Sequence, residues 1–207
     1  MKNQGEGKAG LHWTYGEPSL APDLRQGDII RKTQTLADVL KEKLSAGLAD
    51  ETTHVLVLTQ SCDLARRGAK SCKSPNILVA PVLPVWRLII AQIASYQSEV
   101  EAYAGICRQS AKADLRLFLE RLLNNNEEEY FYLHPDADLG VANHSYAHIR
   151  LCFGLDACLY YEHLRENRAL RLKEPFANKL GWHMGWLYAR VGTEDWVPDH
   201  SSRQEFN

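Results

Sequence analysis

Apolar residues form several short continuous runs that are separated by turn residues. The runs at 54–59 and 77–82 are rich in Val, Ile and Leu, a composition that predicts strands buried on both faces. Residues 26–31 predict a turn that leads into a short strand, and further strands are expected at 130–133 and around 146–153.

Other segments place their apolar residues three and four positions apart, which is the spacing of a helix with one buried face. This spacing predicts a helix over 36–48, where Gly47 lies close to the end. Two apolar faces within 84–123 predict a helical hairpin. A last helix is expected from about 175 to 191, with Pro175 in its first turn.

The expected strands do not alternate with single helices, so a doubly wound parallel sheet is excluded in favour of an α+β fold. Within that class we expect a small barrel or a mixed sheet with a helical insertion and a C-terminal helix. The chain divides into a flexible N-terminal arm over 1–25, one α+β domain over 26–195 that contains the insertion 84–123, and a tail over 196–207.

Composition narrows the class of protein. The formal net charge of −2 over 207 residues gives no chain-wide attraction to nucleic acid, although a local basic patch remains open. The first ten residues contain no apolar run, and no segment has the 18 apolar residues of a membrane span. The five cysteines are irregularly spaced. We therefore expect a cytoplasmic protein with reduced thiols and no membrane association.

Polar and reactive side chains directly follow the buried run at 54–59. Gln60 and Ser61 are candidate binding residues. Cys62 is a candidate nucleophile, with Asp63 beside it and His54 as the group that would favour its thiolate. The alternative is that Cys62 is a small buried residue and that Asp63 caps a turn. Residue statistics favour the alternative, so we expect Cys62 in the core.

A basic loop follows this segment. Arg66, Arg67 and Lys70 are candidate phosphate-binding residues, although the fixed spacing of a P-loop is absent. A solvated loop without a ligand is the commoner outcome for such a charge run. Trp182 and Trp186 lie one helical turn apart, and we expect them to seal a core or a partner groove.

A zinc site is a further hypothesis. The candidate ligands are His54, Cys62, Cys72 and His134, but no CxxC motif or closely spaced ligand pair accompanies them. We therefore expect no metal and no cofactor, and a zinc-stabilised binding protein stays an alternative.

The order of several short motifs resembles the strand series of PemK/MazF-like small β-barrels, which are SH3-like. The strand landmarks are Gly27-Asp28-Ile29, then 55–59 and 79–82. The chain is also similar to a group of uncharacterised bacterial proteins that share further landmarks. These are Gln60-Ser61-Cys62-Asp63-Leu64, the strand 130–133, Arg-Leu-x-x-Pro at 171–175 and Arg-Val-Gly at 190–192.

This resemblance implies the barrel fold and, for the PemK/MazF-like toxins, endoribonuclease activity that uses an Arg just before the second strand. Here Thr52, Thr53 and His54 occupy that place, so the resemblance carries the fold and not the catalytic residues. We expect a bacterial binding module of a toxin or defence-like system that acts through a protein or RNA partner. A homodimer is a further possibility for this chain. The alternative is an endoribonuclease or phosphodiesterase-type hydrolase.

Overall fold

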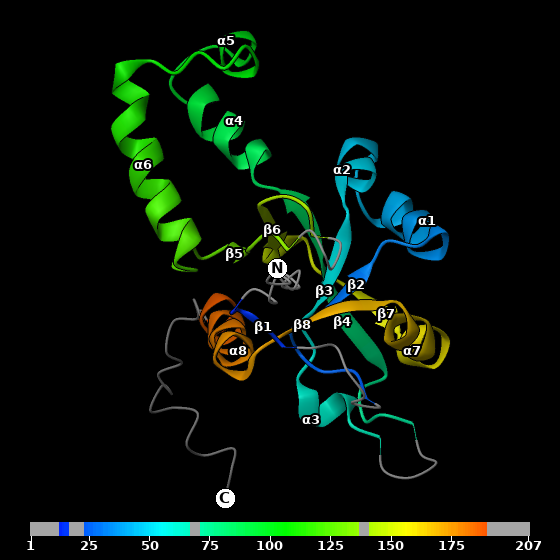
Figure 1. Cartoon of the computed structure of the whole chain (residues 1–207). Helices are drawn as coiled ribbons and strands as arrows, with labels where there is room; N and C mark the ends of the chain where they lie inside the picture. Colours follow the sequence, from blue (N-terminus) through cyan, green and yellow to red (C-terminus); the bar gives the residue numbers. More distant parts are fainter. Residues whose placement is uncertain (1–12, 17–22, 67–70, 137–140, 190–207) are drawn as a thin grey trace, which may run out of the picture.

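The computed structural model describes residues 13–16, 23–66, 71–136 and 141–189, and its elements are shown in Figure 1. Within these ranges the strands are β1 (Tyr15–Gly16), β2 (Asp28–Arg31), β3 (His54–Val57), β4 (Asn76–Pro84), β5 (Tyr130–Leu133), β6 (Ser145–His148), β7 (Phe153–Asp156) and β8 (Arg168–Leu172). The helices are α1 (Gln34–Lys43), α2 (Ala46–Glu51), α3 (Ser61–Leu64), α4 (Trp86–Ala94), α5 (Glu99–Tyr103), α6 (Gln109–Leu123), α7 (Ala157–Glu166) and α8 (Glu174–Tyr188). The α+β class is therefore confirmed.

All strand pairs of the sheet are antiparallel, and the strand order is β1-β8-β2-β3-β4-β6-β5. The long strand β4 pairs with β3 along one edge. Its other edge pairs with β7 through Asn76–Val79 and with β6 through Val82–Pro84. The apolar runs that predicted buried strands correspond to β3 and β4, and every residue of β3 is buried. The strand expected around 146–153 is interrupted by a 3-10 turn at Ile149–Leu151.

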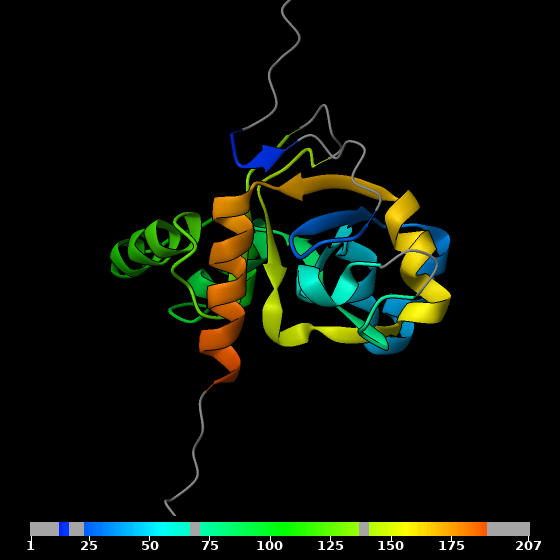
Figure 2. The same cartoon turned by 90° about the horizontal axis from the view of Figure 1, so that it is seen from below.

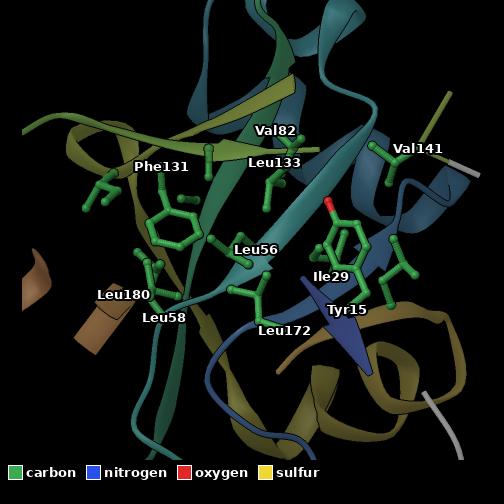
Figure 3. Packing of buried hydrophobic residues seen from close by; sticks show 14 of the residues in the cluster. Tyr15, Ile29, Leu56, Leu58, Val82, Phe131, Leu133, Val141, Leu172 and Leu180 are labelled. Carbon is green, nitrogen blue, oxygen red and sulfur yellow. The ribbon is translucent and has the colours of Figure 1, made fainter. Parts of the chain in front are cut away.

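The sheet curls into an antiparallel half-barrel around one apolar core. Tyr15 of β1 and Phe131 of β5 come from the two ends of the sheet, yet both are fully buried in the same cluster, as Figure 3 shows. The Tyr15 hydroxyl donates a hydrogen bond to the His134 carbonyl oxygen just beyond β5 (2.6 Å). An aromatic side chain therefore anchors this part of the predicted N-terminal arm (1–25) in the core.

Helix α8 covers the gap between the two ends of the half-barrel, and the views in Figures 1 and 2 place it opposite α1 and α7. Its residues Leu180 and Leu187 join the central core. The His183 Nε2 atom lies 2.9 Å from the Glu128 carbonyl oxygen, and the Lys179 ammonium contacts Asn124 and Asn126. The opposite face of the sheet packs on α1 and α7 through a second cluster that includes Leu36, Leu40, Tyr161 and Leu164.

The segment 84–123 leaves the sheet between β4 and β5 and contains three helices, not the two of the expected hairpin. The extra helix, α5, starts at a capping box in which Ser98 and Glu101 satisfy each other's backbone N–H groups. Gly105 follows it with a φ of 76°, a conformation that suits glycine. Phe118 and Leu122 pack the insertion onto the outer face of the sheet in a separate cluster. Of the described helices, none has the length and apolar character needed to cross a membrane.

Candidate anion-binding cleft

The polar segment predicted as a site lies at the end of β3. Sheet pairing stops there because the Thr59 hydroxyl accepts the Leu78 N–H (2.7 Å), and α3 then begins at Ser61. The Cys62 thiol faces the Gln60 side chain with a sulfur–oxygen distance of 3.7 Å. The Asp63 carbonyl oxygen accepts the backbone N–H groups of Lys73 and Ser74 and so holds both ends of the loop together.

The structure does not bring His54 to Cys62. His54 is the first residue of β3, whereas Cys62 follows the end of that strand. At about 3.3 Å per residue, the extended chain from 54 to 59 alone separates them by roughly 16 Å. Burial, assisted by the nearby Arg31 charge, lowers the pKa of His54 to about 4. The imidazole is therefore neutral near pH 7 and too distant to activate the thiol.

The expectation that Cys62 is a core residue is also wrong, because its side chain is exposed. The reason is geometric: the buried run ends at Leu58, and the chain then turns outward into the short helix α3. Only Leu64 of this helix is buried. Ser61 and Cys62 are therefore exposed and Asp63 is half-buried, and each contacts a different neighbour: Gln26, Gln60 and Lys73.

Ser61 instead contributes to a polar cleft of about 470 Å³ between α3 and the first turns of α8. The lining residues are Gly16, Arg25, Gln26, Ser61, Arg171, Leu172, Lys173, Glu174, Ala177 and Asn178. Gln26 holds the cleft to the end of β3 and to α3. Its backbone N–H donates a hydrogen bond to the Ser61 hydroxyl (3.1 Å), and its side-chain amide donates one to the Leu58 carbonyl oxygen (2.8 Å). A Cβ atom at Gly181 would lie 3.1 Å from Gln26 Oε1, so glycine lets α8 approach this closely.

Arg171, one of the lining residues, belongs to a buried cluster of one acid and two guanidinium groups. Asp28 is completely buried, and Arg171 binds its carboxylate through Nε (2.5 Å) and Nη2 (2.8 Å). Arg168 adds a contact of 3.3 Å from Nη1. Both guanidinium groups also donate to the Asp23 carbonyl oxygen.

Two further cationic side chains lie at the rim of the cleft. Arg25 and Lys173 are exposed and line the cleft, and neither forms an ion pair within the described ranges. Glu174 is the one acidic residue of the lining. Hydrogen-bonding groups of Ser61 and Asn178 face the same space. Two exposed cations and one acid at the rim, together with these hydrogen-bonding groups, suit an anionic ligand.

Arg66 is the one predicted phosphate-binding residue that lies within the described ranges, and acidic side chains contact it. Arg66 pairs with Asp23 (3.0 Å) and Glu162, and its guanidinium lies 4.6 Å from the centre of the Tyr161 ring. The Asp23 contact raises the pKa of Arg66. Arg66 therefore ties the end of α3 to Asp23 and to α7. Arg67 and Lys70 lie outside the described residues.

An aromatic pair lies beside the cleft on α8. The rings of Trp182 and Trp186 stack with centroids 6.0 Å apart and planes 20° apart, and the two residues are 64% and 54% exposed. They do not seal a core, because the buried stripe of α8 passes through Leu180, His183 and Leu187. Trp182 is four residues after Asn178, which places it next to the cleft wall on the helix surface.

No described residues form a group of three or more His, Cys, Asp or Glu side chains that could hold a metal ion. The proposed zinc ligands are dispersed: His54 begins β3, Cys62 lies on α3, and His134 packs edge-on against Tyr132 beyond β5.

The sequence did not point to Arg25, Gln26, Arg171 or Lys173 as site residues. The Gly27-Asp28 turn and the Arg-Leu-x-x-Pro motif are visible in the sequence, but nothing in it shows that they adjoin. That contact depends on the pairing of β2 with β8, in which Asp28 opposes Arg171. Comparisons of the chain with protein-family models, curated proteins and solved structures found no match.

Proposed function

We propose that this chain is a binding module for single-stranded RNA, with a backbone phosphate in the cleft and bases stacked on Trp182 and Trp186. The observation that carries the proposal is the continuity of these two features along α8. Asn178 lines the cleft, and Trp182 and Trp186 follow at successive helical turns. Non-specific single-strand binding commonly combines a positive groove with exposed aromatic rings.

The charge of the cleft favours a phosphodiester over an acidic protein surface as the ligand. The net negative chain attracts nucleic acid only where cations gather, and the cleft with Arg25, Arg171 and Lys173 in its lining is such a place. A single strand fits better than a duplex, because paired bases are stacked on each other and cannot cover an indole ring.

We propose that the chain binds RNA without cleaving it. The separation of His54 from Cys62 along β3 removes the acid–base pair that the hydrolase alternative required. The residues that line the cleft include no histidine and no cysteine. We therefore propose that the chain recognises its RNA partner and that catalysis, where needed, comes from another protein.

For the finer fold we propose a variant of the SH3-like, PemK/MazF-like small barrel. The landmark segments Gly27-Asp28-Ile29, 55–59 and 79–82 fall in or beside β2, β3 and β4, which are neighbours in the curled sheet. This arrangement supports the proposed membership of a bacterial toxin or defence-like system, although fold likeness is weaker support for function than the cleft.

Fluorescence anisotropy with a labelled RNA oligomer tests the proposal, with a DNA single strand and an RNA duplex of equal length as competitors. We expect binding that weakens with salt and a preference for single strands over the duplex. Lys173→Glu should weaken binding and lower the salt slope by about 0.7, the value for one single-strand phosphate contact. The control is Lys41→Glu, which reverses the charge of an exposed lysine on α1. Equal losses in both variants, or no binding by the wild-type chain, would overturn the proposal.

A further inference from the structure

A second cavity, of about 410 Å³, lies where the loop after α3 returns to β4 beside the start of α7. Its lining residues are Arg66, Ser71, Cys72, Lys73, Ser74, Pro75, Ala157, Cys158, Tyr161 and Glu162. Two of the five cysteines of the chain therefore line one cavity, although 85 residues separate them in the sequence. The proposed RNA site makes no use of either thiol.

Backbone pairing holds the two thiol-bearing segments together. Asn76 of β4 pairs with Asp156 of β7, and the Ala157 N–H donates to the Pro75 carbonyl oxygen (2.8 Å). Cys158 is the residue directly after Ala157, and Cys72 lies three residues before Pro75. The Cys72 thiol donates to the Ser74 carbonyl oxygen (3.3 Å), which turns its side chain back toward this junction.

The two thiols differ in access. Cys158 is exposed in the first turn of α7, whereas Cys72 is half-buried on the cavity wall. Burial raises the pKa of the Cys72 thiol, and the neighbouring Cys158 contributes to the same shift to a smaller extent. Their electrostatic interaction agrees with their place on one cavity. An oxidant that arrives from solvent therefore meets Cys158 first.

The remaining cysteines lack this arrangement. Cys62 contacts Gln60, Cys152 contacts the Tyr188 hydroxyl (3.0 Å), and Cys107 contacts the Arg108 carbonyl oxygen. None of these three lines the cavity of Cys72 and Cys158.

We propose that Cys72 and Cys158 form a peroxide-oxidisable dithiol that closes into a reversible disulfide across this cavity. The Cys158 thiolate attacks one oxygen of hydrogen peroxide, the O–O bond breaks, and the departing hydroxide leaves as water with the thiol proton. Cys158 is then a sulfenic acid. The Cys72 sulfur attacks it, the S–S bond forms as the S–O bond breaks, and the hydroxyl leaves with the Cys72 proton as a second water. Two thiols are oxidised and one peroxide is reduced to two waters.

The test treats the reduced full chain with limiting hydrogen peroxide, blocks free thiols and maps cross-linked peptides by tandem mass spectrometry without reductant. We expect the Cys72–Cys158 link within the monomer, and we expect dithiothreitol to remove it. The link should persist in Cys62→Ser and in Cys152→Ser, which removes the other cysteine close to Cys158 in sequence.

In Cys72→Ser the sulfenic acid on Cys158 should persist and react with dimedone, since its resolving thiol is gone. The wild-type map does not depend on how any variant folds. The proposal is overturned if wild-type Cys158 proceeds to sulfinic acid without the link, if it links to Cys152 or to another chain, or if neither thiol reacts.

Discussion

Arg171 of β8 binds the completely buried carboxylate of Asp28 on β2 through two guanidinium nitrogens, at 2.5 and 2.8 Å. The two residues are register partners across the pairing of these strands. The contact therefore joins the start of the domain to its last strand. It also fixes one wall of the cleft, because Arg171 and the neighbouring Leu172 and Lys173 line it. Stability and the candidate site depend on the same ion cluster.

Replacing Asp28 with Asn should be strongly destabilising. The change would remove the carboxylate charge that the nearly buried guanidinium groups of Arg168 and Arg171 contact. Breaking a buried ion pair by removing one partner costs about 3–5 kcal/mol. Urea unfolding measures the loss, and Asp50→Asn at the exposed end of α2 is the control, with an expected change within about 0.5 kcal/mol. A similar small change in Asp28→Asn would show that the cluster adds nothing to stability.

The buried imidazole of His54 should make the free energy of unfolding depend on pH in the acid range. Its pKa of about 4 in the folded chain lies below the usual value of 6.5, so the unfolded chain binds more protons between these limits. The stabilisation is present above about pH 6.5 and is lost as the pH falls toward 4, by up to about 3 kcal/mol. Burial also lowers the pKa values of His148 and His183, so both act in the same direction.

Urea unfolding near pH 7 and near pH 5 measures this dependence. His54→Gln should flatten the profile, because the amide does not titrate, while His148 and His183 keep a residual slope. An unchanged slope in the variant would show that His54 is not the group that titrates. The control is His163→Gln, which removes the half-buried imidazole that contacts Thr33.

The hydrophobic pattern predicted those strands that are buried along a continuous run and the helix that buries a regular apolar stripe. The runs at 54–59 and 77–82 became β3 and β4, and the helical spacing at 175–191 became α8 within a few residues of each end. The segment 157–172 was not predicted as α7 followed by β8. Leu159 is 75% exposed there, so the apolar residues do not follow a clean helical stripe. The sequence signal for the start of this helix is Asp156, whose side chain caps α7.

The site was less predictable than the fold because its residues meet only through strand pairing. Ser61 was predicted as a binding residue and does line the cleft. Its neighbours Arg25 and Lys173 are ordinary surface cations in the sequence, and only the β2–β8 pairing brings them to one place. Arg66 was predicted as a ligand contact, but Asp23 and Glu162, distant in sequence, engage it.

Two glycines of α8 should respond differently to alanine. Gly185 has open space where a Cβ would stand, so Gly185→Ala should stabilise the chain by about 0.5–1 kcal/mol through helix propensity. At Gly181 the new methyl would press on Gln26 Oε1 at 3.1 Å and disturb the amide contact to Leu58. We therefore expect a smaller gain or a loss in Gly181→Ala. Thermal unfolding of both variants measures the difference, and equal gains would show that the Gln26 contact is not constrained.

The stacked indoles of Trp182 and Trp186 should contribute to RNA affinity. Trp182 is 64% exposed, so alanine there should change the free energy of unfolding by no more than about 0.5 kcal/mol. Loss of one stacking surface should weaken binding to single-stranded RNA by about 1–3 kcal/mol.

Anisotropy titrations of Trp182→Ala and Trp186→Ala measure this effect, and thermal unfolding of the same samples verifies that they are folded. Leu159→Ala is the matched control, because it removes an exposed apolar side chain from α7, the helix that lies opposite α8 in Figure 1. The salt slope should stay close to wild type in both tryptophan variants, since no cation is removed, whereas Lys173→Glu should lower it. Wild-type affinity in both tryptophan variants, with a loss only in Lys173→Glu, would keep the cleft as an anion site and remove the stacking platform.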